Sequence, residues 1–184
     1  MLATDILSEE HQVILRVITT LENAANRLNQ GEAIRPGFFI DAADFIKGFA
    51  DGCHHKKEEG VLFIAMQANG VPVQGGPIGV MLYEHEQGRT YTRGMRAAAE
   101  KLAAGDKAAS KEIVENALNY AALLRQHIYK EDNILFPMAN RTIPESKQVQ
   151  VAEDFERIEH EETGEGVHEK YLALAEKLEQ ELIS

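Results

Sequence analysis

The segment HHKKEEGVLF (54–63) carries the pattern that decides the fold, and the segment HIYKEDNILF (127–136) repeats it. In each segment a histidine and a glutamate stand four residues apart, just before an apolar run. On an α-helix two such residues lie on one face, about 6 Å apart along the axis. We interpret the two segments as related halves of one helical structure that present the same pair of side chains.

Helical periodicity extends outward from both segments. Apolar residues recur every three or four positions through four long stretches, as on the buried faces of amphipathic helices. Glycine and proline separate these stretches at 31–36, 70–77, 105–106 and 140–144, with a weaker break at 163–166. No stretch alternates with period two for long enough to form a strand. The sequence predicts an all-α fold, an up-down-up-down four-helix bundle with an additional C-terminal helical segment.

The length of 184 residues suits a single domain covering 1–184. We expect the bundle to occupy about 4–140 and the C-terminal helical extension about 145–184. The extension is acidic, and its charges are expected to form a solvated helix face; they include Glu156, Glu159, Glu161, Glu162, Glu165 and Glu169. His160 and His168 are also expected to lie in this solvated tail.

Composition excludes several classes of function. Lys and Arg number 19 against 30 Asp and Glu, and the net charge of −11 argues against a nucleic-acid partner. The first 30 residues mix charged and apolar side chains and resemble neither a signal peptide nor a membrane span. Cys53 is the single cysteine, which fits a reducing compartment. We therefore expect a cytoplasmic protein without a membrane partner.

Six polar side chains occupy positions where the helical period requires apolar ones. They are His11, His54, Glu58, His85, His127 and Glu131. A single buried histidine is usually structural, but six such groups spread over four predicted helices indicate a site. Burying an ionised carboxylate is costly unless the carboxylate is paired or binds a metal.

The predicted helices place these groups at similar heights in the bundle. His11 lies 19 residues before the end of the first helix near residue 30, and His54 lies 18 residues after the start of the second. His85 and His127 lie 19 and 20 residues from the junction between the third and fourth helices. The junction at 70–77 matches less well, and its irregular loop can absorb the offset. All six groups can therefore meet in one layer of the core.

Imidazole and carboxylate ligands without a thiolate cluster suit iron, manganese or zinc. Two carboxylates in one layer suit two ions, because a carboxylate can bridge a pair of metals. We prefer iron to manganese or zinc because di-iron carboxylate centres are a known use of bundle cores. The set leaves coordination positions open for small ligands.

The ordered set of motifs resembles the hemerythrin-like, or HHE cation-binding, family over about residues 1–140. The strings that carry the resemblance are HHKKEE (54–59), EHE (84–86) and HIYKE (127–131), together with His11. The resemblance implies a non-haem di-iron centre bridged by Glu58 and Glu131, with or without an oxo or hydroxo bridge. It also implies that His11 and His54 serve one metal and that His85 and His127 serve the other.

The sequence departs from the oxygen-carrying members at two places. Arg89 stands where they have a second histidine on the third helix, and the last motif is His-x-x-x-Glu rather than His-x-x-x-x-Asp. One iron therefore has fewer obvious ligands, which argues against reversible carriage of O₂. His55 is the leading candidate for an extra ligand. It lies about 100° around the helix from His54, so an exposed position or a place behind the ligands stays open as an alternative.

Three classes of function remain. The first is a redox protein that binds or reacts with O₂, peroxide or nitric oxide at two iron ions. The second is an oxygen or iron sensor, or an iron-homeostasis protein without turnover. The third is a structural bundle with an incidental metal site. Whether the protein is an enzyme, and which protein partner it has, stay open.

Overall fold

The computed structural model describes residues 2–183, apart from the side chain of residue 162, and contains no strand among them. The prediction of an all-α fold is confirmed. The α-helices are α1 (Ala3–Asn29), α2 (Pro36–Phe45), α3 (Phe63–Ala68), α4 (Pro77–Ala103), α5 (Ala109–Lys130), α6 (Phe136–Thr142), α7 (Glu145–Arg157) and α8 (Val167–Ile183). Four π-helical segments complete the set: η1 (Ile46–His55), η2 (Glu58–Leu62), η3 (Glu131–Leu135) and η4 (Ile158–Thr163).

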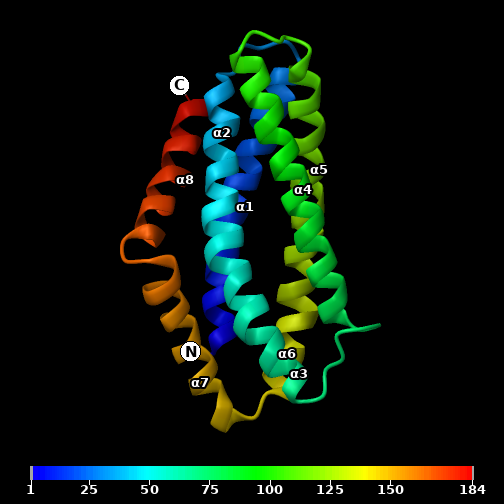
Figure 1. Ribbon diagram of the computed structural model, residues 1–184, viewed down its shortest axis with the longest axis vertical. Helices are drawn as coiled ribbons and strands as arrows, with labels where there is room; N and C mark the ends of the chain where they lie inside the picture. The colour runs from blue at the N-terminus through cyan, green and yellow to red at the C-terminus, as the bar shows by residue number, and fades with distance from the viewer. Residues whose placement is uncertain (1, 184) are drawn as a thin grey trace.

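These elements combine into four long rods that form the predicted bundle (Figure 1). The second rod runs from α2 through η1 and η2 to α3, and the fourth runs from α5 through η3 to α6. Pro36 and Pro77 stand in the first turns of the second and third rods, where a missing N–H costs no hydrogen bond. Gly31 and Gly105 follow the first and third rods with φ of 89° and 102°, a conformation that glycine adopts without strain.

The rods pack in a ring. Helix α1 lies beside α5, α5 beside α4, and α4 beside α2. Few contacts join α1 directly to α2, and α8 packs against both of them along this side of the bundle (Figure 1). The C-terminal extension, α7, η4 and α8, therefore covers the seam between the first and second rods.

Apolar residues fill the bundle in two clusters with a polar layer between them. One cluster includes Ile14, Ala50 and Leu124, and the other includes Leu7 and Val61. The predicted polar positions fall between these clusters on every rod; for example, His11 stands between Leu7 and Ile14 in the chain. The apolar clusters thus enclose the layer from both ends.

Three of the π-helical segments begin or end at the predicted site. Segment η1 ends at His54 and His55, η2 begins at Glu58, and η3 begins at Glu131. A π-helix bonds residue i to i+5, so its turn is wider than that of an α-helix and neighbouring side chains are separated by less than 100°. This geometry brings His54 and His55 together onto the core face.

None of the described helices combines the length and the apolar composition needed to cross a bilayer.

Candidate metal centre

The polar layer brings all six predicted side chains, and His55, into the middle of the bundle. Each of the seven is at most 3% exposed. His11 comes from α1, His85 from α4 and His127 from α5, while His54, His55 and Glu58 come from the second rod and Glu131 from η3. Four rods thus contribute to one buried cluster, as the predicted axial heights require.

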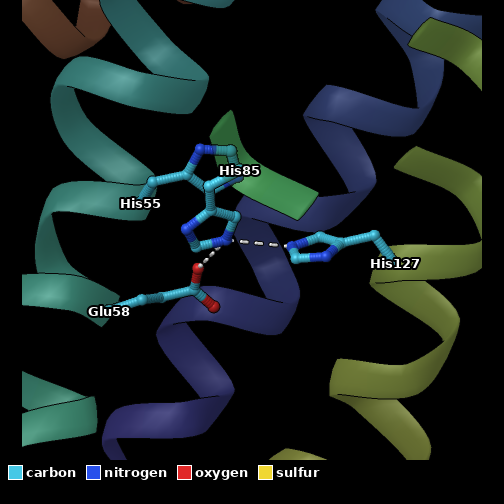
Figure 2. A group of neighbouring side chains, drawn as sticks. All are labelled: His55, Glu58, His85 and His127. Atoms are coloured by element: carbon cyan, nitrogen blue, oxygen red, sulfur yellow. Dashed lines mark hydrogen bonds and ion pairs between the residues drawn. The ribbon is translucent and has the colours of Figure 1, made fainter. Parts of the chain in front are cut away.

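The ligand atoms form two overlapping groups. The first group is His11, His54, Glu58 and Glu131, and one donor atom from each lies within 4.8 Å of the others. The second group is His55, Glu58, His85 and His127, with the same spacing (Figure 2). Glu58 belongs to both groups. Glu131 also reaches both, with one oxygen 3.2 Å from His11 Nε2 and the other 3.0 Å from His127 Nε2.

Several buried polar atoms in this cluster have no hydrogen-bond partner among the described residues. They are Nε2 of His11, Nε2 of His54 and both carboxylate oxygens of Glu58 and of Glu131. His85 Nε2 and His127 Nε2 lie 3.0 Å apart, and two ring nitrogens at this distance share one proton or one cation. Unpartnered buried polar atoms are rare in folded proteins and costly. The donor set therefore fits metal ions held between these side chains.

Each of the five histidines is held from behind by a carboxylate on Nδ1, at 2.7 to 2.9 Å. The pairs are His11 with Asp132, His54 with Glu10, His55 with Asp51, His85 with Glu59, and His127 with Glu84. A carboxylate on Nδ1 fixes the ring orientation and directs Nε2 inward, which is the usual arrangement behind metal-binding histidines.

Cationic side chains stand behind four of these carboxylates, because Arg89 pairs with both Glu59 and Asp51. Lys57 Nζ lies 2.5 Å from Glu10 and 2.7 Å from Glu159, and Lys57 is completely buried. Arg89 lies 2.7 Å from Glu59, and Lys130 pairs with Glu84. Burial by itself would raise the pKa of Glu10, but His54 and Lys57 outweigh it and lower the pKa to about 2. Glu10, Glu59 and Glu84, whose pKa values are all lowered, are therefore held as anions, whereas burial raises the pKa of Asp51 to about 6.

The histidine pKa values show how strongly this environment attracts positive charge. Burial opposes protonation of His11, but the neighbouring carboxylates of Asp132 and Glu131 outweigh it and raise its pKa to about 10. Burial also opposes protonation of His85, but the surrounding carboxylates of Glu131, Glu58 and Glu59 outweigh it and raise the pKa to about 11. A metal ion at either Nε2 must therefore displace a tightly held proton.

His55 behaves differently from its neighbours. Burial and the nearby His85 lower its pKa well below the usual value, so its ring stays neutral. A neutral imidazole has a free lone pair for a metal ion. Of the two alternatives left open by the sequence, the structure places His55 in the buried layer, in the second group.

Glu159, His160 and His168 lie in the C-terminal extension, and of these three Glu159 contacts the surroundings of the polar layer. His160 and His168 belong to neither group, and His168 Nδ1 lies 3.4 Å from Glu159 Oε1. Glu159 itself was expected on a solvated face, but it is only 32% exposed on its side chain and bonds Lys57. Glu159 also groups with Glu10, Cys53 and His168, and the cation between the two carboxylates of this group is the ammonium of Lys57.

Sequence reasoning missed the carboxylates behind the histidines, although the sequence contains a signal for them. A glutamate directly precedes both His11 and His85, and an acidic residue directly follows both Glu58 and Glu131. These four neighbours supply four of the five acceptors on Nδ1. Asp51 supplies the fifth, one helical turn before His55.

Comparisons with known proteins agree with this geometry. The model of the hemerythrin HHE cation binding domain matches residues 2–139. The chain is 25% identical, over 167 residues, to uncharacterized proteins of Mycobacterium bovis and of Mycobacterium tuberculosis strain H37Rv. The match covers 89% of this chain and 63% of each relative, so the chain spans less than two-thirds of the relatives' length. No solved structure matches the chain significantly.

Proposed function

Since the chain belongs to the hemerythrin HHE cation-binding family, we propose that it is a non-haem di-iron protein that binds or reacts with O₂, peroxide or nitric oxide. The observation that carries this proposal is the pair of overlapping donor groups, which share Glu58 and contain buried atoms without a partner. The first ion would be held by His11 and His54 and the second by His55, His85 and His127. Glu58 and Glu131 would bridge the two.

The charge of the cluster supports two ions rather than one. Seven carboxylates either belong to the two groups or contact their histidines: Glu10, Asp51, Glu58, Glu59, Glu84, Glu131 and Asp132. The three cationic side chains that pair with them are Lys57, Arg89 and Lys130. With neutral histidines this set has a net charge of −4, which two divalent ions would neutralise.

The donors are nitrogen and oxygen atoms only, and they are histidines and carboxylates on bundle helices, a combination suited to iron. Bound iron would supply both a coordination position for a small molecule and electrons for its reduction. The chain's own contribution is to orient the ligands through the Nδ1 carboxylates and to exclude bulk water with the apolar cluster on each side. His55 supplies an imidazole to the group in which Arg89 replaces a histidine.

An oxygen or iron sensor is the second candidate. It is favoured by the contacts that lead from His54 through Glu10 and Lys57 to Glu159 on the C-terminal extension. A change in ligand binding at His54 would in this way be transmitted to η4 of the C-terminal extension.

Metal analysis of iron-supplied, aerobically purified protein tests the centre. We expect about two iron ions per chain, because each donor group holds one. In His55→Ala the second ion should be retained more weakly, while His160→Ala, an exposed histidine outside both groups, should keep the wild-type content. One zinc and no iron in the wild type would contradict the di-iron proposal. Equal iron content in the two variants would remove His55 from the ligand set.

Stopped-flow mixing of the reduced protein with O₂, peroxide and nitric oxide tests the chemistry. A spectrum that forms with O₂ and reverts when O₂ is removed would indicate a carrier. If this reversibility is lost in His55→Ala, His55 protects the centre from oxidation. Fast oxidation in both proteins would indicate a redox enzyme. Absence of any spectral change in iron-loaded protein would contradict the proposal and favour a sensor of iron.

A further inference from the structure

A cavity of about 460 Å³ opens between η1 and α4, on the side of the bundle that holds the second donor group. Four cationic side chains line it, Lys47, Arg89, Arg93 and Arg96, together with Asp51. We refer to these five residues as the cationic pocket. Their local charge of +3 stands out in a chain with a net charge of −11. Counted with the carboxylates that already pair with the arginines, Asp44, Glu59, Glu86 and Glu100, the site carries a charge of −1, so an anion binds here by taking the place of those carboxylates.

The existing partners of these cations leave room for an anionic ligand. Arg93 pairs with Glu86 at 2.9 Å, and Arg96 pairs with Asp44 and with Glu100. The acidic side chains in these pairs are 48 to 59% exposed, and such exposed pairs contribute little to stability. Lys47 has no ion pair among the described residues. A ligand that meets Lys47, Arg93 and Arg96 at once can therefore replace the present partners of the two arginines.

The other half of the bundle lacks this set of cations at the equivalent positions. The corresponding face lies between α5 and α1, and its positions follow from aligning His127 with His54 and His11 with His85. The residues equivalent to Lys47, Asp51, Arg89, Arg93 and Arg96 are, in that order, Tyr120, Leu124, Leu15, Thr19 and Glu22. None of them is cationic. Arg125 stands at the position equivalent to Gly52 and pairs with Glu22, so the halves differ in where their cations stand.

The pocket contacts the second donor group through two carboxylates. Asp51, in its wall, accepts a hydrogen bond at 2.9 Å from His55 Nδ1. Arg89 lies 3.4 Å from Asp51 and 2.7 Å from Glu59, and Glu59 lies 2.7 Å from His85 Nδ1. An anion that binds Arg89 would therefore act on the carboxylates that orient two histidines of this group.

We propose that the cationic pocket binds a small organic anion, a carboxylate or a phosphate ester, next to the second donor group. Arginine presents a planar fork of donors that matches both of these oxyanions. The cavity volume lies within the range of sites for small molecules, and Ala43 and Thr92 offer apolar contacts for the rest of the ligand. An effect of this anion on the centre rests on the proposed function, whereas its binding in the pocket does not.

Calorimetric titration of the metal-loaded protein tests the pocket. The probes are succinate and glycerol 3-phosphate, with succinamide and glycerol as neutral counterparts. We expect at least one of the anions to bind and neither neutral compound to do so. The variant Arg93→Gln/Arg96→Gln should weaken binding by at least about tenfold, because it removes charge-assisted hydrogen bonds. Both residues are on the surface, so the fold should remain intact.

Arg125→Gln is the matched control. Arg125 pairs with Glu22 on the opposite face and lies outside the cationic pocket, so its replacement should leave the affinity unchanged. The proposal is overturned if neither anion binds, if the double variant binds as well as the wild type, or if Arg125→Gln weakens binding equally. The iron content of the same samples separates the two proposals. Loss of iron with retained anion binding contradicts only the proposed function, and two iron ions without anion binding contradict only the pocket.

Saturation with the anion that binds should also change the absorption spectrum of bound iron, through Asp51 and Glu59. An unchanged spectrum at saturation would overturn the link between the pocket and the centre.

Discussion

The bundle consists of two halves that use the same local device. The first half is α1 with the rod from Pro36 to Ala68, and the second is α4 with the rod from Ala109 to Thr142. Each half has a Glu-His pair on its first rod and a Lys-Glu-acid triplet on its second; these are 10–11 and 57–59 in the first half and 84–85 and 130–132 in the second. The glutamate before the histidine bonds the histidine of the other rod in the same half.

The triplets connect the halves to each other. Their last residues, Glu59 and Asp132, each hold the first-rod histidine of the opposite half, His85 and His11. Their lysines, Lys57 and Lys130, each pair with the glutamate behind the histidine of their own rod. Equal short motifs thus produce equal contacts in both halves.

The halves differ in what surrounds these contacts. The side chain of Lys57 is 0% exposed and has a second carboxylate, Glu159, from the C-terminal extension, whereas that of Lys130 is 32% exposed. The first half also adds His55 and Asp51, where the second has Ile128 and Leu124. The comparison teaches that local sequence sets the pairing, while later segments of the chain decide how strongly each pair is shielded from water.

Metal removal should have the largest effect on thermal stability, because both halves supply side chains to the buried polar layer. Between about pH 6.5 and pH 10 the metal-free protein keeps protons on His11 and His85, one from each half, that the unfolded chain has lost. The stability from these protons is full below the unfolded pKa and is lost as the pH rises through the folded values of about 10 and about 11. Metal-loaded protein carries no such protons. The difference in Tm between loaded and chelator-treated protein should therefore widen as the pH is raised.

Thermal melts across this pH range, with metal loss verified by elemental analysis, measure this difference. A constant or shrinking difference would show that the metals do not replace protons on these histidines.

Replacing Lys57 and Lys130 separately should show that the equivalent ion pairs of the two halves contribute unequally to stability. Lys57→Met leaves Glu10 and Glu159 without their buried cation, so it should lower the free energy of unfolding by about 3–5 kcal/mol. Lys130→Met removes a pair that water already screens, so its cost should be at most about 1 kcal/mol. Urea unfolding of both variants tests this difference, and equal costs would mean that the C-terminal extension does not shield Lys57.

Tyr120→Phe should have the smallest effect. Tyr120 occupies the position in the second half that Lys47 occupies in the first, and its buried hydroxyl has no hydrogen-bond partner among the described residues. Removing an unpaired hydroxyl should leave stability unchanged or raise it by about 1 kcal/mol. The same urea titration measures it. A loss of stability would reveal a partner for this hydroxyl, such as a buried water.

The fold and the convergence of the six polar positions follow from sequence because both depend on periodicity. Helical spacing places His11, His54, His85 and His127 on core faces, and chain counting places them at one height. The sequence named His55 as the leading candidate for an extra ligand but left an exposed position open, because the expected 100° step belongs to an α-helix and η1 is a π-helix. The role of Glu159 did not follow either, because its contact with Lys57 depends on how the extension packs. That these residues bind iron stays a prediction.

The contact between Lys57 and Glu159 also bears on how the protein is made. Synthesis proceeds from the N-terminus, so every partner in the second half, up to Asp132, leaves the ribosome before Glu159 does. Until the extension emerges, the seam between α1 and α2 has no α8 over it, and Lys57 has only one of its two carboxylates. The segment that covers the His11 and His54 side of the polar layer is therefore translated after every side chain of the layer itself.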